Sequence, residues 1–182
     1  MDPRSFVDAL AGATIGTTFN FYAEGAGASA RRERLACYLE SRRAATILLV
    51  GEAAGYRGAR VSGLPFTSER QRSGTGPAEA TATIVHRVLA ELGLEESVLL
   101  WNVVPTHPHL PGRHDSNRRP TTAEVAGGRR FVELLAAGRC VVPVGRVAQA
   151  EVGGPYVRHP ARGGAGGFRT GLVAALGQNV TT

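Results

Sequence analysis

The chain has 182 residues, enough for one α/β domain with a hydrophobic core and too few for two ordinary domains. With 43% hydrophobic and 20% charged residues, its composition is that of a globular protein and excludes a disordered chain. The net charge of +6 predicts a polyanionic partner. Because no apolar run could cross a bilayer and the first residues lack a signal-peptide pattern, we expect a cytoplasmic protein without a membrane partner.

The basic and sulfur-containing side chains limit the chemistry that the chain can perform. All 21 residues in the Lys+Arg count are arginines, so no lysine side chain is available to form a Schiff base. The two cysteines, Cys37 and Cys140, cannot supply the four thiolates of an iron–sulfur cluster. We therefore expect a protein that works without a cofactor.

Hydrophobic periodicity predicts an alternation of helices and strands after an irregular segment at residues 1–30. In chain order we expect a helix at 31–43, a strand at 46–50, a helix at 77–92, a strand at 97–104, a helix capped by Thr121 or Thr122 and reaching 137, a strand at 140–144, a short helix at 146–150, a short strand at 156–157 and a helix at 168–176.

This alternation predicts an α/β fold with three α/β/α layers around a central, mostly parallel sheet of four strands. We expect residues 1–182 to form one domain, with the motifs in a core at 46–177. Ligands of such sheets bind outside the carboxyl ends of the strands. The loops after Val50, Val104 and Val157 are therefore the predicted location of the functional residues.

The glycine-rich loop at 51–63 carries the most specific motif. It reads Gly51-Glu52-Ala53-Ala54-Gly55 and leads to Gly63-Leu64-Pro65-Phe66. It lacks the glycine pattern of dinucleotide-binding loops and the lysine of a P-loop. Taken alone, its glycines could simply permit a tight turn.

The string as a whole resembles the first motif of the uracil-DNA glycosylase superfamily. Its spacing is similar to that of the single-strand-selective monofunctional branch, whereas Glu52 followed by Ala53 resembles the thermostable iron–sulfur branch, whose cluster cysteines are lacking here. The later matches follow in family order: Trp101-Asn102-Val103-Val104, Asn117-Arg118-Arg119-Pro120-Thr121, Val144-Gly145-Arg146 and Val157-Arg158-His159-Pro160. The resemblance implies a divergent bacterial DNA glycosylase.

The resemblance also implies which residues are catalytic. His159 occupies the position of the histidine that stabilises the departing base at its O2 oxygen. Glu52 is the candidate for positioning water or stabilising the cation-like sugar. The best-known branches carry Asp or Asn where this chain has Ala53, so either Glu52 takes over that role or catalysis depends on His159 and backbone amides.

Five positions are implied in binding the base. Asn102 can donate to uracil O4 and accept from N3–H, a pattern that cytosine reverses. Phe66 matches the aromatic ring on which the extruded base stacks. The resemblance implies Gly51, Ala53 and Gly55 as the other three positions, and Gly55 lacks the tyrosine that excludes thymine in the classical branch.

Arginines around the motifs are the implied DNA contacts. Arg162 is the only long side chain in the glycine-rich loop at 161–167, and we expect it to act as a wedge in the helix or as a phosphate contact. The phosphate contacts expected beside the other motifs are Arg57, Arg60, Arg158 and Arg169.

A histidine-rich loop permits two interpretations. The spacing of His107 and His109, with His114 and Asp115 nearby, occurs in zinc sites. The prolines between and around these histidines favour a rigid surface segment beside a DNA groove. We therefore expect no metal.

The combined prediction is a monomeric, monofunctional enzyme that hydrolyses the glycosidic bond of uracil flipped out of single- or double-stranded DNA. Specificity for hypoxanthine, xanthine or mismatched thymine remains an alternative, as does a binding protein of the same fold without activity. A nucleoside hydrolase would share such a site and would also cleave free deoxyuridine. A cross-linking relative would carry a basic run ending in histidine after the first motif, but the stretch after Phe66 reads TSERQRSGTG.

Overall fold

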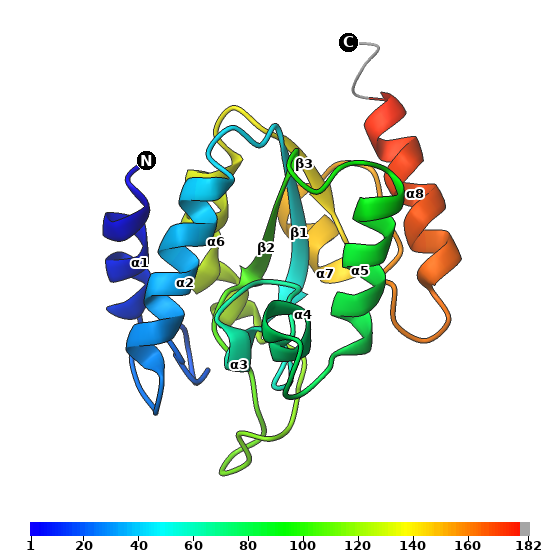
Figure 1. Cartoon of the computed structure of the whole chain (residues 1–182). Helices are drawn as coiled ribbons and strands as arrows, with labels where there is room; N and C mark the ends of the chain where they lie inside the picture. Colours follow the sequence, from blue (N-terminus) through cyan, green and yellow to red (C-terminus); the bar gives the residue numbers. More distant parts are fainter. Residues whose placement is uncertain (179–182) are drawn as a thin grey trace.

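A parallel sheet of three strands forms the centre of the computed structural model, which describes residues 1–178 (Figure 1). The strands β1 (Ile47–Ala53), β2 (Val98–Val104) and β3 (Cys140–Pro143) lie in the spatial order β2-β1-β3. The helices are α1 (Pro3–Ala11), α2 (Ala28–Ser41), α3 (Ala59–Ser62), α4 (Glu69–Ser73), α5 (Ala80–Glu91), α6 (Thr122–Ala136), α7 (Arg146–Val152) and α8 (Ala165–Gln178). The predicted α/β class with a parallel sheet is confirmed.

The predicted fourth strand at 156–157 is only a single parallel bridge between Val144 and Val157. The Val157 N–H donates to the Pro143 carbonyl at 3.2 Å, and the Gly145 N–H donates to the Val157 carbonyl at 2.8 Å. Pro155 and Pro160 enclose this short segment, and because proline has no N–H, neither can extend the ladder. The four-stranded sheet of the prediction is therefore corrected to three strands and a bridge.

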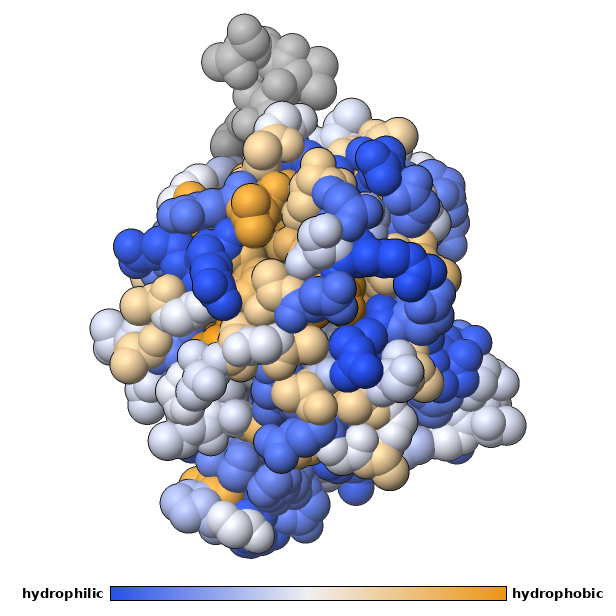
Figure 2. Space-filling view, turned by 90° about the vertical axis from the view of Figure 1, so that its left-hand side faces the viewer, coloured by the Kyte–Doolittle hydropathy of each residue, from blue (hydrophilic) through white to orange (hydrophobic). Residues whose placement is uncertain are grey.

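Helices cover both faces of the sheet because alternate strand residues point to opposite sides. Leu48 and Val50 belong to one buried cluster, with residues of α1, α2 and α6. Ile47 and Leu49 belong to a second cluster, with residues of α5 and α8. Figure 2 views the α1 side, where hydrophilic residues predominate at the surface. Within residues 1–178, no helix combines the length and apolar character needed to span a membrane.

The prediction of an irregular segment at residues 1–30 is wrong, because α1 lies within it and α2 begins at Ala28. Asp2 caps α1, and its Oδ2 accepts from the Ser5 N–H at 2.7 Å. Phe6 is 3% exposed and packs edge-on against Trp101, with ring centroids 5.4 Å apart. The Asp-Pro cap and the apolar positions four residues apart were visible in the sequence.

Several boundaries differ from the prediction by a few residues. The helix expected from Pro77 begins at Ala80, and the last helix begins at Ala165 rather than at 168. Of the two predicted caps, Thr121 and Thr122, the structure has Thr121, which forms a capping box with Glu124. The short helix α3 lies within the predicted loop at 51–63, and α4 follows in a stretch for which no element was predicted.

Phe6→Ala tests whether α1 is an integral part of the core. The substitution should lower the free energy of unfolding by about 3–5 kcal/mol, because it leaves a cavity beside Trp101. Urea unfolding followed by the fluorescence of Trp101, the only tryptophan, measures this directly. Asp8→Ala on the exposed side of α1 is the matched control. Equal stabilities of the two variants would show that α1 contributes little.

Candidate functional site

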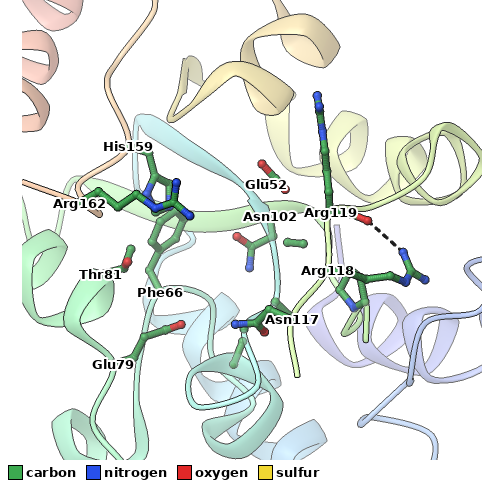
Figure 3. A pocket seen from close by; sticks show the side chains of 15 residues that line it. Glu52, Phe66, Glu79, Thr81, Asn102, Asn117, Arg118, Arg119, His159 and Arg162 are labelled. Carbon is green, nitrogen blue, oxygen red and sulfur yellow. Dashed lines mark hydrogen bonds between the residues drawn. The ribbon is translucent and has the colours of Figure 1, made fainter. Parts of the chain in front are cut away.

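A cavity of about 700 Å³ opens where the carboxyl-terminal halves of β1 and β2 meet the surrounding loops (Figure 3). Its size is within the range of small-molecule sites. The position agrees with the prediction that chemistry lies beyond the carboxyl ends of the strands. The lining residues come from β1, β2, α3, α5 and the loops between elements: Glu52, Ala53, Ala54, Gly55, Ala59, Phe66, Glu79, Thr81, Asn102, Pro108, Asn117, Arg118, Arg119, His159 and Arg162.

Asn102 and Phe66 meet above Gly51. Gly51 pairs with Asn102 in the register of β1 and β2. A Cβ atom at Gly51 would lie 2.8 Å from the Asn102 Oδ1 and would overlap the Phe66 ring. Both side chains are largely buried, at 5% exposure for Asn102 and 7% for Phe66. The absent side chain at Gly51 therefore lets an amide and an aromatic ring share one wall of the cavity.

Backbone strain is concentrated at this cavity. Among the described residues, the only non-glycine residues with positive φ are Phe66, at 51°, and Arg162, at 53°. Both line the cavity. This conformation is unfavourable for residues with a Cβ atom, and such strain is typically found at functional sites.

The surroundings of His159 define its tautomer. The Ala161 N–H donates to the His159 Nδ1 at 3.2 Å, so the neutral ring carries its proton on Nε2. Burial lowers the pKa of His159, which favours this neutral form at neutral pH. His159 can therefore donate a hydrogen bond from Nε2 without carrying a positive charge.

Glu52 lies near the end of β1 and is half-buried. Burial raises the pKa of the Glu52 carboxyl, and the nearby charge of Arg119 partly opposes this rise. No hydrogen bond to its carboxylate occurs within residues 1–178, so its oxygens can accept from water or from a ligand. Ala53, the next residue, also lines the cavity but offers no polar side-chain atom.

The loop that carries Asn117, Arg118 and Arg119 is held by the buried carboxylate of Glu124, whose side chain is 1% exposed. Arg118 donates to this carboxylate from Nη1 at 2.7 Å and from Nη2 at 2.5 Å. The N–H groups of Thr17 and Thr121 donate to it as well, at 3.3 and 2.9 Å. These bonds lower the pKa of Glu124 to about 2.

Other bonds attach the same loop to the first motif. The Tyr56 N–H donates to the Asn117 Oδ1 at 3.0 Å. His107 is fully buried, and its Nδ1 lies 2.9 Å from the Ala54 carbonyl, so this nitrogen carries the proton. His109 stacks on His114, with centroids 4.2 Å apart. Within residues 1–178, no group of three His, Cys, Asp or Glu residues is arranged to hold a metal ion.

Positive charge lies at the mouth of the cavity. Figure 3 shows Arg162 and Arg119 on opposite sides of the opening, with Glu52 between them in this view. Both arginines are exposed. Two exposed cations therefore face each other across the mouth of the cavity.

The remaining predicted DNA-binding arginines are not among the residues that line the cavity: Arg57, Arg60, Arg158 and Arg169. Arg60 donates from Nε to the Tyr56 carbonyl oxygen at 3.1 Å, which braces the first motif. Arg169 lies on α8 with its Nε 3.6 Å from Glu91. These positions permit contacts with DNA outside the cavity, so the assignment stays a prediction.

Comparison with known proteins agrees with this geometry. A family model for the uracil DNA glycosylase superfamily matches residues 40–176. The chain belongs to this superfamily. The crystal structure of wild-type SMUG2 from Pedobacter heparinus is similar with a TM-score of 0.70, covers 100% of both chains and is 13% identical, a level at which the likeness concerns the fold alone. No curated protein matches the sequence.

In this superfamily member the structure brings most of the predicted site residues together. Glu52, Ala53, Gly55, Phe66, Asn102, His159 and Arg162 line the cavity, and Gly51 lies beneath it. No role was predicted for several other residues that line the cavity. Asn117, Arg118 and Arg119 were visible as part of a motif, whereas Glu79 and Thr81 lie at the start of α5 and carried no local signal.

Arg118→Ala tests the link between Glu124 and the motif-bearing loop. It should lower the free energy of unfolding at pH 7 by about 3–5 kcal/mol, because it removes the cationic partner of a buried carboxylate. Arg113→Ala in the same loop is the control: Arg113 is exposed and lies 3.5 Å from Asp115, so its loss should cost less than about 1 kcal/mol. Similar decreases in the free energy of unfolding in both variants would contradict a special role of Glu124.

The same contact predicts a dependence of stability on pH. The pKa of Glu124 is about 2 in the folded protein and 4.5 for an ordinary glutamate. Its stabilisation is thus complete above pH 4.5 and is lost as the pH falls towards 2, by about 3 kcal/mol in all. Urea unfolding between pH 5 and pH 2 should show this decrease in the wild type and a smaller one in Arg118→Ala.

Proposed function

We propose that the chain is a monofunctional DNA glycosylase that hydrolyses the bond between uracil and deoxyribose in a nucleotide flipped out of DNA, leaving an abasic site. The observation that carries the proposal is the convergence of Phe66, Asn102, His159 and Glu52 on one cavity of about 700 Å³. Membership of the superfamily supports a DNA substrate. We place the reaction in one domain that spans residues 1–182 and acts as a monomer.

Recognition of uracil follows from Asn102 and Phe66. The Asn102 amide donates from Nδ2 to uracil O4 and accepts at Oδ1 from N3–H, whereas cytosine presents the opposite polarity at both atoms. The Phe66 ring supplies a stacking surface, worth roughly 1–3 kcal/mol for a base on an aromatic side chain. This offsets part of the few kcal/mol that extrusion costs.

Cleavage of the glycosidic bond leaves negative charge on the departing uracil. His159 donates from Nε2–H to the O2 oxygen, where part of this charge collects, and it does so as a neutral ring. A fixed donor aimed at a developing oxyanion contributes mainly in the transition state. His159 therefore stabilises the leaving base and need not transfer its proton completely.

The sugar becomes cation-like as the bond breaks. The ionised Glu52 stabilises this charge and accepts a proton from the water that attacks C1′. Ala53 has no polar side chain for this task, which assigns it to Glu52. Because the sequence contains no lysine, the enzyme has no lysine side chain with which to form a Schiff base and cut the strand.

Binding of the DNA backbone rests on Arg119 and Arg162 at the mouth of the cavity. Each would contact a phosphate beside the extruded nucleotide. Arg162 has a strained φ and is the only long side chain at 161–167, where the other residues are glycine and alanine. Arg57, Arg60, Arg158 and Arg169 extend the proposed contact surface beyond the cavity.

The first test is excision of uracil from labelled oligonucleotides, single-stranded and opposite guanine or adenine, with alkali to reveal abasic sites. His159→Ala should lower the single-turnover rate by about 100- to 1,000-fold, because it removes a donor to the leaving base. His114→Ala, an exposed histidine in another loop, is the control and should retain the wild-type rate. Binding of every oligonucleotide without cleavage by the wild type would instead indicate a binding protein or another damaged base.

A second test uses the pH dependence of the rate. Glu52 must be ionised to act, so excision should fall as the pH drops through its pKa, at a higher pH than for an ordinary glutamate because burial raises that pKa. Arg119→Ala removes the charge that opposes this rise and should move the acid limb to still higher pH. Single-turnover rates at saturating enzyme, with Glu52→Gln as the variant that cannot ionise, measure this. An unchanged acid limb in Glu52→Gln would exclude Glu52 as its source.

A further inference from the structure

Glu79 places a second carboxyl group in the cavity, on the segment that enters α5. It is the residue before the first turn of α5, yet its side chain makes no capping hydrogen bond to the helix. Its carboxylate lies against the first motif instead. A Cβ atom at Gly55 would overlap its Oε1, and a Cβ atom at Gly58 would overlap its Oε2. The two glycines therefore leave the space that the Glu79 carboxylate fills.

This carboxyl group has no evident structural partner. Within residues 1–178, no hydrogen bond or ion pair involves its oxygens, although the side chain is partly buried. Burial raises the pKa of Glu79, with no neighbouring charge to compensate. An unpaired, partly buried carboxyl group is unfavourable for folding. Such a group in a cleft is a candidate for contact with a ligand.

The arrangement around Phe66 indicates which edge of the base Glu79 would meet. Figure 3 shows His159 and Glu79 on opposite sides of the Phe66 ring, with Asn102 beside it. In a pyrimidine, O2, then N3 and O4, then C5 follow one another around the ring. With O2 at His159 and N3 and O4 at Asn102, C5 lies across the ring from C2 and therefore on the side of Glu79. Asn117 lies between Asn102 and Glu79 in this view, but its Oδ1 already accepts from the Tyr56 N–H.

We propose that Glu79 is the specificity-determining residue at position 5 of the base, admitting a hydrogen atom there and rejecting a methyl group. The inference rests on the proposed function, because it uses the orientation of uracil given by Asn102 and His159. Uracil places only C5–H against the carboxyl group. The methyl group of thymine would occupy the same space and would remove water from the carboxyl group without offering a hydrogen bond.

Three proteins test this: the wild type, Glu79→Ala and Glu79→Gln. Alanine opens the space beside Gly55, and glutamine keeps nearly the same volume. The measured quantity is the ratio of kcat/KM for thymine to that for uracil, each opposite guanine in the same duplex. Glu79→Ala should raise this ratio at least about tenfold, in the range that one methyl group can provide. Glu79→Gln should lie between the wild type and Glu79→Ala.

A binding measurement separates failure of this inference from failure of the proposed function. Duplexes with 2′-fluoroarabino-uridine or 2′-fluoroarabino-thymidine resist hydrolysis, so their Kd values report discrimination even if the wild type cleaves nothing. The wild type should prefer the uracil analogue, and Glu79→Ala should lose at least about tenfold of that preference. If the wild type cleaves nothing but still prefers the uracil analogue, and Glu79→Ala loses that preference, the proposed function is overturned and the inference about Glu79 stands.

Gly55→Ala keeps the glutamate at position 79 but moves its carboxylate, because the added Cβ atom would overlap Oε1. It should therefore also change the ratio of thymine to uracil, in cleavage or in binding. The inference is overturned if the wild type treats thymine and uracil alike, or if Glu79→Ala and Gly55→Ala both keep the wild-type ratio while folded by circular dichroism.

Discussion

The site depends on a close approach between the two central strands and the loop that follows β1. Gly51 lies opposite Asn102 in the sheet, and any side chain at Gly51 would enter the space of Asn102 and Phe66. The amide is costly to bury without a partner. The sheet nevertheless holds it next to an aromatic surface, and within residues 1–178 no hydrogen bond to the Asn102 amide group is present. The fold thus holds an amide and an aromatic ring together at one wall of the cavity.

A second contact fixes the other wall of the cavity. The Glu124 carboxylate binds Arg118, Thr17 and Thr121, and so joins the segment after α1, the motif-bearing loop and the start of α6. Asn117 then connects this loop to the first motif. Arg119 can therefore extend into solvent from a loop whose backbone is well anchored. The N-terminal segment, which carries no motif, takes part in this anchoring.

Motif residues were predictable because they follow strands, and the carboxyl ends of parallel strands meet at one edge. Asn102 and His159 were placed correctly at the cavity for this reason. Asp2 and its helix were missed although the cap was local and readable. Glu79 could not be predicted: its meeting with Gly55 results from the packing of the start of α5 on a distant loop, and neither residue has a neighbour that indicates this. Spacing along the chain predicts which residues lie at the ends of strands, but it does not predict contacts between elements that are distant in the sequence.

Arg162 has a consequence for attempts to improve the protein. Its left-handed backbone costs an arginine about 1–2 kcal/mol, and its exposed side chain makes no hydrogen bond or ion pair within residues 1–178 that would compensate. Glycine adopts this conformation without strain, and glycines follow directly in the loop. Selection for thermal stability alone would thus favour glycine at position 162. A heat-resistant variant obtained in this way would lose a cation at the mouth of the cavity, so the charge of the cavity and the stability of the loop make opposite demands on this one position.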